Sequence, residues 1–199
     1  MEVSKALLGK FLIHEYHGHK IGGMIVETEA YIGPEDKASH AFGGKKTKRN
    51  LAEYLIGGHI YIYLVYGMYW QLNISTSFHD VPECVLIRAL EPTDGITQMK
   101  KLRHTDKASN LTSGPGKICQ ALKLDKSFYG YDICRRDSKL YVEDRGILIP
   151  AKKISCSPRI GIDYAGPYWS KIPWRFYISK KNMLEYQCAE TKSQQKGDR

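Results

Sequence analysis

Hydrophobic and polar positions alternate over several short stretches of the chain, and a period of two predicts β-strands. Near the N-terminus, residues 10–16 and 21–28 show this pattern on either side of the polar segment 17–20, which predicts a hairpin. Residues 59–66 read HIYIYLVY and are rich in the β-branched and aromatic types that favour strands. The sequence YGMY at its end predicts a turn that leads into an antiparallel strand at 70–76.

The remaining predicted strands are separated by turns. The strand at 83–90 is predicted to be buried, and those after it are predicted to be short. A polar loop is expected at 33–48, and the sequence shows no regular alternation of strands and helices that would indicate a parallel sheet. The further strands are expected at 83–90, 140–143, 152–162 and 174–179.

Three short helices are predicted. Ser4 is a candidate N-cap for a first helix at 5–9, because its hydroxyl can accept a free N–H of the first turn. The segment 92–103 has a helical start at its proline, threonine and aspartate. A third helix at 113–122 carries Pro115 near its first turn, where a missing N–H costs nothing.

Composition then limits the domain organisation. A chain of 199 residues with 42% hydrophobic residues is long enough for one domain with its own core. We expect a domain at 1–188 and a disordered tail at 189–199, where the polar sequence AETKSQQKGDR ends the chain. The overall prediction is a single α+β domain.

The charge balance points to a polyanionic partner. Thirty Lys and Arg stand against 21 Asp and Glu, and an excess of that size favours nucleic acid over an anionic membrane. Every apolar run is short, and no signal peptide is evident, so a cytoplasmic protein is expected, not a secreted one. The five cysteines form no CxxC pair, which fits a reducing compartment.

The segment 24–40, MIVETEAYIGPEDKASH, carries the first candidate chemistry. On a strand, Glu27, Glu29 and Tyr31 share one face because side chains alternate. Two carboxylates that end a strand before a glycine-proline loop are either solvated edge residues or the rim of a pocket. Spacing does not decide between these readings, nor between the two glutamates.

The segment 61–69, YIYLVYGMY, is the second candidate. Tyr61 and Tyr63 share a strand face, and Tyr66 stands at the predicted turn, where an aromatic residue is unusual. An exposed aromatic tip is typical of proteins that wedge side chains between base steps of DNA. The alternative is that these tyrosines are core residues with paired hydroxyls.

Two further patterns give weaker evidence for a functional site. The histidines of HEYHGH, at 14–19, have the spacing of a hairpin turn and not of a metal motif, so no metal site is predicted. SGPGK, at 113–117, lacks the full phosphate-loop pattern, although a helix N-terminus followed by Lys117 can hold a backbone phosphate.

Taken in order along the chain, eight motifs resemble the alkyladenine (3-methyladenine) DNA glycosylase family. They extend from Lys5 to about Ser179 and therefore cover almost the whole sequence. The resemblance implies a curved, mostly antiparallel sheet with short flanking helices and a protruding β-hairpin that inserts into DNA. The motifs are ALLGKFL, VETEAYIGPEDKASH, GGKKTKRN, YGMYWQLNIS, CVLIRALEP, SGPGKICQAL, RIGI and RFYIS.

The resemblance also implies catalytic roles. Glu29, not Glu27, matches the general base that activates water. Arg88 matches the residue that helps hold this water, and the backbone of Ile160 matches a second contact to it. Arg88 beside Glu29 is expected to favour the ionised carboxylate despite burial.

Further matched positions concern the base and the DNA. Tyr31, His40 and Tyr63 match the walls of the base pocket, and the backbone N–H of His40 matches a contact to the base. Asn73 matches the side chain that rejects guanine, and Tyr66 matches the intercalating residue. We expect further DNA contacts from Met68, Tyr69, Lys45, Lys46, Thr47, Arg49 and Lys117.

The implied activity is that of a monomeric, monofunctional DNA glycosylase. It flips a damaged purine out of double-stranded DNA and hydrolyses its N-glycosidic bond without a metal or organic cofactor. No lysine occupies a matched catalytic position, so no lyase activity is expected. The lesion stays open among 3-methyladenine, 7-methylguanine, hypoxanthine and ethenoadenine, because residues 70–72 depart from the family pattern.

Two alternatives use the same features differently. A non-catalytic protein that binds lesions or bent DNA would share the Tyr66 wedge and the basic segment 43–49. Such a protein has no use for a pair of residues that hold water. An RNA-binding barrel would stack single-stranded bases on its tyrosines.

Overall fold

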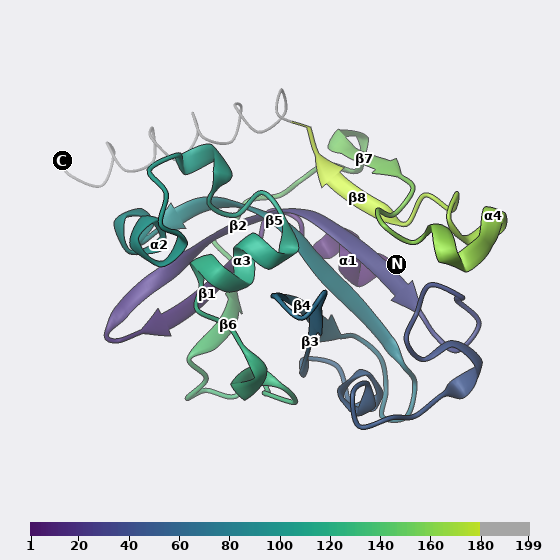
Figure 1. The fold of residues 1–199 in the computed structure, drawn as a ribbon. Coiled ribbons are helices and arrows are strands. Elements are labelled where there is room, and N and C mark those ends of the chain that lie inside the picture. The colour runs from purple at the N-terminus through teal and green to yellow at the C-terminus, as the bar shows by residue number, and fades with distance from the viewer. Residues whose placement is uncertain (180–199) are drawn as a thin grey trace.

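Two long antiparallel strands, β2 (His19–Ile32) and β5 (Glu83–Asp94), run through the middle of the molecule and organise its single sheet. The computed structural model describes residues 1–179, so the tail expected at 189–199 lies outside the described part. Within it, strands pair in the order β3-β4-β5-β2-β1-β6, and β8 joins β2 to β7 (Figure 1). All of these pairings are antiparallel. The fold is the expected single α+β domain with a curved sheet.

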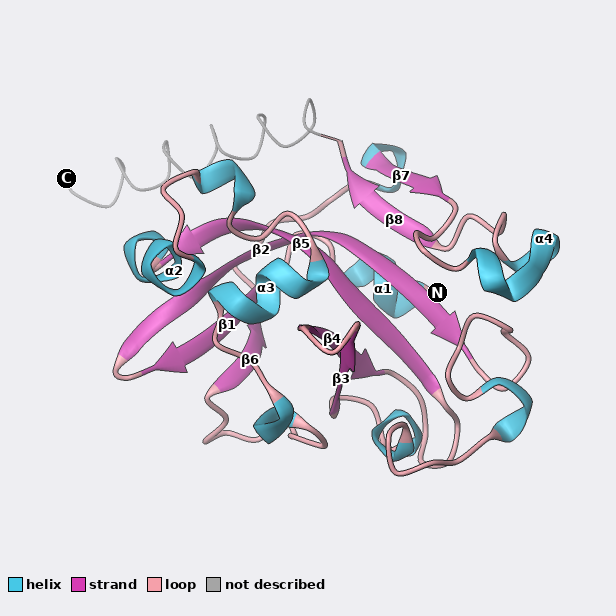
Figure 2. Ribbon diagram, in the orientation of Figure 1, coloured by secondary structure: helices cyan, strands magenta, loops and turns pink. Residues whose placement is uncertain are grey.

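The other elements are short (Figure 2). The strands are β1 (Phe11–Tyr16), β3 (Ile60–Val65), β4 (Tyr69–Ser75), β6 (Leu140–Glu143), β7 (Ile154–Ser157) and β8 (Arg175–Ile178). The α-helices are α1 (Glu2–Ala6), α2 (Ile96–Arg103), α3 (Pro115–Ala121) and α4 (Gly166–Trp169). Single 3-10 turns are η1 (Phe42–Gly44), η2 (Leu51–Tyr54), η3 (Ala108–Asn110), η4 (Lys126–Phe128), η5 (Ala151–Lys153) and η6 (Asp163–Ala165).

The core lies between the sheet and the helices α2 and α3. Met99 of α2 and Ile118 of α3 are fully buried with the strand residues Phe11, Ile25 and Ile87. These apolar side chains leave water together, which at about 25 cal/mol per Å² is the dominant favourable term in folding. The helix α1 packs on β2, where the Thr28 hydroxyl donates to the Ser4 carbonyl.

β2 changes neighbours along its length, and this change positions the site. Its first half pairs with β1, and its second half pairs with β8 at 27–29. Register shifts against β5 occur at Ile25/Glu27 and Glu27/Thr28. Irregularities of this kind bend a strand and re-aim its side chains, and they are common beside active sites.

The β3–β4 hairpin projects from the sheet as expected. Only Asn73–Ser75 of β4 pair with β5, whereas the part of β4 nearer the turn pairs with β3 alone. β3 is the end strand of the sheet, so the part of the hairpin nearer its turn pairs with no third strand. The hairpin tip therefore extends beyond β5.

Two of the predicted helices begin at the wrong residue. Ser4 is not an N-cap: it lies fully buried inside α1, which ends at Ala6. Residues 92–94 belong to β5, because Pro92 and Asp94 pair with β2. The helix α2 starts only after Gly95, whose left-handed backbone (φ 64°) ends the strand. Pairing with a long neighbouring strand outweighs a local helical start.

The strand predictions are confirmed with changed limits. The turn of the first hairpin is reduced to His17 and Gly18, so β2 begins at His19. The strand expected at 152–162 is confined to β7, because a 3-10 turn precedes it and no partner strand extends beyond it. The helix α3 has its proline at the first turn as predicted.

No helix in residues 1–179 is both long and apolar enough to cross a membrane. The four cysteines in this range, Cys84, Cys119, Cys134 and Cys156, are free thiols.

We predict that Gly23→Ala lowers the free energy of unfolding by about 2–4 kcal/mol. A Cβ at Gly23 would lie 2.2 Å from the Glu91 carbonyl oxygen of β5, so the two central strands must separate. Gly57→Ala is the control, because its Cβ would meet only ordinary contacts from 3.4 Å. Urea unfolding measures both variants, and equal losses would contradict this account of the strand contact.

Candidate active site

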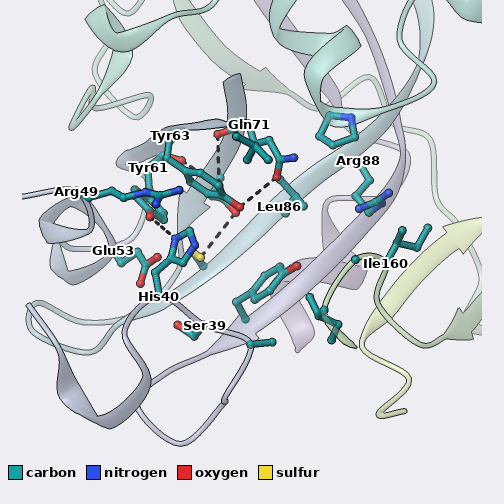
Figure 3. A pocket seen from close by; sticks show the side chains of 18 of the residues that line it. Ser39, His40, Arg49, Glu53, Tyr61, Tyr63, Gln71, Leu86, Arg88 and Ile160 are labelled. Carbon is teal, nitrogen blue, oxygen red and sulfur yellow. Dashed lines mark hydrogen bonds between the residues drawn. The ribbon is translucent and has the colours of Figure 1, made fainter. Parts of the chain in front are cut away.

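A cavity of about 400 Å³ opens at one end of the β2–β5 pair. Strand β2, the 38–40 loop, the β3–β4 hairpin, β5 and the 160–164 loop all contribute to its wall (Figure 3). The lining includes Tyr31, Ser39, His40, Arg49, Glu53, Tyr61, Tyr63, Tyr66, Gln71, Asn73, Arg88, Ile160 and Tyr164. Segments far apart in the sequence therefore meet at one place.

Aromatic rings form much of this wall. Tyr31, His40 and Tyr63 line the cavity together, and the ring centroids of His40 and Tyr63 are 4.6 Å apart. The Tyr63 hydroxyl donates to Gln71 Oε1 at 3.1 Å. A space of this size between aromatic faces suits a planar, apolar-faced ligand.

Asn73 lies deep in the cavity and is held rigidly. Its side chain is 2% exposed, and Nδ2 donates to the Tyr61 carbonyl at 3.1 Å. The Cys84 thiol lies 3.9 Å from Oδ1. These contacts fix the orientation of the amide. A side chain that discriminates ligands by shape must be held in this way, because a mobile one would move aside.

Glu29 lies directly behind the cavity wall and is fully buried. Its Oε1 accepts the Ile160 N–H at 2.9 Å and lies 3.3 Å from Arg88 Nη1, and its Oε2 accepts the Tyr31 hydroxyl at 2.9 Å. Each of these partners lines the cavity, although Glu29 itself does not. The carboxylate is thus one contact away from the open space.

Burial raises the pKa of Glu29 above its ordinary value of 4.5. Arg88, the Ile160 N–H, the Tyr31 hydroxyl and Arg159 each act against this shift, in that order. The expectation that Arg88 favours ionisation is correct in sign, but desolvation is the larger effect. A carboxylate with a raised pKa is more basic, which suits proton abstraction.

The structure separates the two glutamates that spacing leaves equivalent. Glu27 and Glu29 both contact Arg88, which confirms that they share a face. Glu27 is partly exposed and accepts from Arg175 as well, at 3.1 Å. Only Glu29 is fully removed from water and surrounded by donors, one of which is the backbone N–H of Ile160 in the 158–162 loop.

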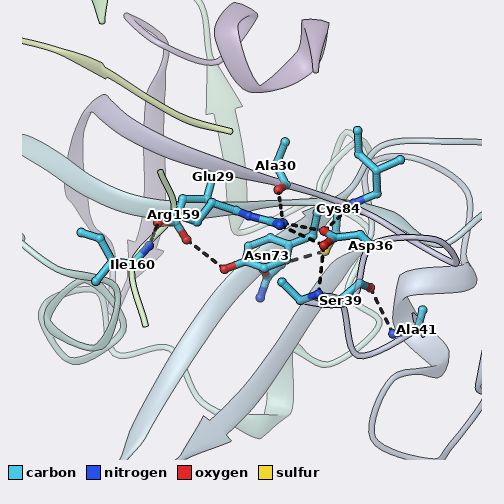
Figure 4. A network of polar contacts seen from close by, with 12 residues as sticks. Glu29, Ala30, Asp36, Ser39, Ala41, Asn73, Cys84, Arg159 and Ile160 are labelled. Atoms are coloured by element: carbon cyan, nitrogen blue, oxygen red, sulfur yellow. Dashed lines mark hydrogen bonds and ion pairs between the residues drawn. The ribbon is translucent and has the colours of Figure 1, made fainter. Parts of the chain in front are cut away.

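A buried ion pair holds the loop that carries Ile160, and the sequence prediction missed it. Arg159 and Asp36 are both fully buried, and Arg159 contacts both carboxylate oxygens and the Ala30 carbonyl (Figure 4). The guanidinium also lies over the ring of Tyr31, 4.7 Å from its centroid. Asp36 in turn accepts the Ala38 N–H at 2.9 Å. One ion pair therefore fixes both loops beside Glu29.

The hairpin tip presents Tyr66 to solvent in a strained conformation. Tyr66 is 86% exposed, and its φ of 54° lies in the left-handed region that costs a non-glycine residue about 1–3 kcal/mol. The next residue, Gly67, has φ 68°, so the pair forms a tight turn. Met68 is 64% exposed beside them. A large apolar tip is therefore held away from the core.

The predicted basic residues are placed unequally around the cavity. Arg49 lies over the ring of Tyr63, 5.1 Å from its centroid, and lines the cavity. Lys46 pairs with Asp80, and Thr47 is bound to Asn50, so these two are engaged within the protein. Lys45 is exposed and makes no ion pair in the described part of the chain.

A second groove lies beside the hairpin, between its base and the start of α3. Tyr66, Tyr69, Arg103 and Lys117 line it. Lys117 donates to Ser113 Oγ at 3.1 Å, and a Cβ at Gly116 would meet the Tyr69 side chain at 3.0 Å. The helix and the hairpin thus form one surface with two cations on it.

Sequence reasoning also missed two polar residues of the cavity. Glu53 in η2 and Gln71 in β4 line it, although Glu53 lies outside the eight motifs and Gln71 stands at one of the positions that depart from the family pattern. A polar residue that interrupts an apolar stretch is the only sequence signal they give. No cluster of three or more His, Cys, Asp or Glu that could hold a metal occurs within residues 1–179.

Comparison with known proteins agrees with this geometry. The family model described as methylpurine-DNA glycosylase (MPG) matches residues 1–182. The chain belongs to the methylpurine-DNA glycosylase family. It is therefore a DNA-repair glycosylase, and its substrate is DNA.

Curated relatives cover nearly the whole chain. A protein of Clostridioides difficile (strain 630) is 42% identical over 89% of this chain and 95% of its own length. One from Clostridium tetani is 46% identical over 89% and 90%, and one from Bacillus cereus (strain AH820) is 44% identical over 91% and 94%. All three carry the name "Putative 3-methyladenine DNA glycosylase".

We predict that Asp36→Ala lowers the free energy of unfolding by about 3–5 kcal/mol, because it leaves the buried Arg159 charge unpaired. Asp137→Ala is the matched control, since Asp137 and its partner Arg135 are both well exposed. An exposed pair contributes about 0–1 kcal/mol. Thermal and urea unfolding measure both. Similar losses in the two variants would show that burial is not the reason for the effect.

Proposed function

We propose that this protein flips a damaged purine from double-stranded DNA into the aromatic cavity and hydrolyses its N-glycosidic bond. The observation that carries the proposal is the fully buried Glu29, held by three groups that themselves line the cavity. The product is an abasic site and a free base. The protein acts as a monomer, in the compartment that holds the DNA.

The aromatic wall selects the base. N-alkylated purines carry positive charge, and electron-rich rings attract a cation by about 0.5–2 kcal/mol. Tyr31, His40 and Tyr63 provide such faces. We infer that Asn73, whose amide is fixed by the Tyr61 carbonyl, excludes the extra amino group of guanine. The backbone N–H of His40 offers the base a donor.

Glu29 is the general base. Water between Arg88 and the backbone of Ile160 lies within reach of Oε1, because both groups already contact that oxygen. As the bond to the purine breaks, C1′ becomes electron-poor, and the carboxylate stabilises it while it takes a proton from the water. The proton ends on Glu29, the hydroxyl on C1′ and the electron pair on the departing base.

The hairpin keeps the base out of the duplex. Extrusion of a nucleotide costs a few kcal/mol, least for a damaged base that pairs weakly. Tyr66 fills the gap in the stack, with Met68 and Tyr69 on the minor-groove side. Lys45, Lys46, Thr47, Arg49 and Lys117 supply backbone contacts, for which Lys46 and Thr47 exchange their present partners.

The reaction is monofunctional. Strand cleavage by a glycosylase needs an amine that forms a Schiff base. No lysine among residues 1–179 lines the cavity, and this supports a water nucleophile.

The direct test is a panel of duplexes, each with one 3-methyladenine, 7-methylguanine, hypoxanthine or ethenoadenine, treated with alkali to cleave abasic sites. At least one lesion should give a strand break that appears only after alkali. Salt-sensitive binding without breaks would favour a lesion-binding protein. Tighter binding to single-stranded RNA than to any lesion duplex would favour an RNA-binding barrel.

We predict that Glu29→Gln lowers the single-turnover rate of excision by about 10²–10⁴-fold, the range of a lost general base. Glu27→Gln is the control on the same strand and against the same arginine, and it should lower the rate less than about tenfold. Circular dichroism checks that both fold. Full activity in Glu29→Gln would exclude it as the base.

The pH dependence has a defined sign. Glu29 acts when deprotonated, so the rate falls as pH falls through its pKa, which burial raises above 4.5. The same raised pKa means that the folded protein binds the proton more tightly than the unfolded chain does. As pH rises through the raised pKa of Glu29, the free energy of unfolding therefore falls. The rate of excision rises over the same pH interval.

We predict that Tyr66→Ala lowers excision from duplex DNA by about 10–100-fold, because the vacated stack is no longer filled. Its stability should not fall, since an exposed ring in a strained turn adds little to the core. Tyr168→Ala, in α4 and 71% exposed, is the control and should excise normally. Equal rates in the two variants would exclude the intercalating role.

A further inference from the structure

One buried side chain, Asn50, holds two segments of the proposed site at the same time. It is 1% exposed and directly follows the loop 45–49, which carries proposed DNA contacts. The other segment is the 38–40 loop, which contributes to the cavity wall. Asn50 itself does not line the cavity, so its effect on the site passes through these two segments.

All the hydrogen-bonding positions of the Asn50 amide are used. Its Nδ2 donates to the His40 carbonyl at 3.1 Å and to the Lys45 carbonyl at 2.8 Å. Its Oδ1 accepts the Thr47 N–H at 2.7 Å and the Thr47 hydroxyl at 2.9 Å. A carbonyl only accepts and a backbone N–H only donates, so the partners themselves determine which way the amide faces. The contacts to His40, Lys45 and the Thr47 N–H are to backbone, so they persist if the Thr47 hydroxyl turns to DNA.

The peptide unit that follows His40 is held at both ends. Asn50 binds the His40 carbonyl, and the N–H of Ala41 donates to Ser39 Oγ at 3.1 Å (Figure 4). The His40 ring in turn packs against Tyr63, with 4.6 Å between the ring centroids. This part of the cavity wall is therefore placed through its backbone, by a side chain that lies outside the cavity.

We propose that Asn50 is a positioning residue that places His40, beside the flipped base, relative to the DNA backbone held by the loop 45–49. The inference rests on the proposed function, which assigns the base to His40 and backbone contacts to this loop. C1′ of the flipped nucleotide lies between its base and its backbone, so both supports decide how it faces Glu29. One amide that binds both supports keeps the distance between them constant.

Loss of this link affects DNA binding and excision differently. The cations of the loop 45–49 remain, and the affinity for duplex DNA depends on charge more than on exact geometry. Excision does depend on geometry, because a misplacement of about 1 Å can lower a rate about 10²-fold. The maximal rate of excision therefore falls while the affinity for DNA is kept.

The test measures single-turnover excision against protein concentration, on the lesion duplex that the wild type excises fastest. In Asn50→Ala the maximal rate should fall by about 10–100-fold. The half-saturating concentration should change by less than about threefold. Asn50→Asp keeps an oxygen toward Thr47 and replaces the amide donors to the His40 and Lys45 carbonyls, so its maximal rate should fall within the same range.

Ser138→Ala is the matched control. Ser138 is 9% exposed, and its hydroxyl likewise donates to a backbone carbonyl, that of Leu140, at 2.6 Å. It lies outside the cavity wall, so the variant loses a buried hydrogen bond without loss of a link to the site. Both the maximal rate and the half-saturating concentration should stay at their wild-type values.

Hydrogen exchange measured by NMR follows the backbone directly and needs no excision. The Ala41 amide should exchange about tenfold faster in Asn50→Ala than in the wild type, because the peptide after His40 is released locally. The amide of Ile87, in the core of β5, should exchange at the wild-type rate in the same variant. Ser138→Ala should change neither amide.

Three results would overturn the inference: a normal maximal rate in Asn50→Ala, an equal loss of rate and affinity, or exchange that rises alike at Ala41 and Ile87. The last result would mean a general loss of stability. Absence of excision in the wild type, with faster exchange at Ala41 alone in Asn50→Ala, would reject the proposed function and leave the hold on His40 intact. Equal excision by the wild type and Asn50→Ala would reject this inference alone.

Discussion

Burial of the Glu29 carboxylate is the constraint on which the rest of this structure depends. A charge without water is costly unless it is paired and hydrogen-bonded. The protein supplies donors from three places: Tyr31 on the same strand, Arg88 on β5 and the backbone of Ile160. Each of these must be held accurately, and the architecture around β2 follows from that need.

The Arg159–Asp36 ion pair holds the loop that carries the Ile160 donor to Glu29. It fixes Ile160 through its neighbour in sequence, and it fixes the 36–40 loop through the Ala38 N–H. Because both partners are fully buried, the pair adds geometric precision more than net stability. The guanidinium also supports Tyr31 from the face of its ring. One ion pair thereby couples the Glu29 carboxylate to two walls of the cavity.

The cavity combines an aromatic wall with a few buried polar groups, and these two features act at different levels. Stacking rewards any planar, electron-poor base, so it gives affinity without fine selection. Asn73 is a directional group whose amide is held from behind by the Tyr61 carbonyl. The exposed hairpin tip lies at the edge of the same cavity, since Tyr66 also lines it.

Much of the fold could be read from local patterns. Alternation and enrichment in β-branched and aromatic residues located the strands, and the YGMY turn indicated the hairpin, because these patterns depend on neighbours in sequence. Residues 92–94 were mispredicted because long-range pairing with β2 decided their structure. The ordered motifs indicated Glu29, Arg88 and Asn73, and the structure places Arg88 and Asn73 in the wall of one cavity with Glu29 directly behind it.

The sequence alone determined the family, the α+β class and many of the residues that meet at the cavity. The tertiary structure showed why the two glutamates differ: the 158–162 loop, far away in sequence, donates the Ile160 N–H to the fully buried Glu29, whereas Glu27 stays partly exposed. It also revealed Arg159, Asp36 and Glu53. Burial and pairing across the fold are properties of the folded contacts, and no spacing along the chain encodes them.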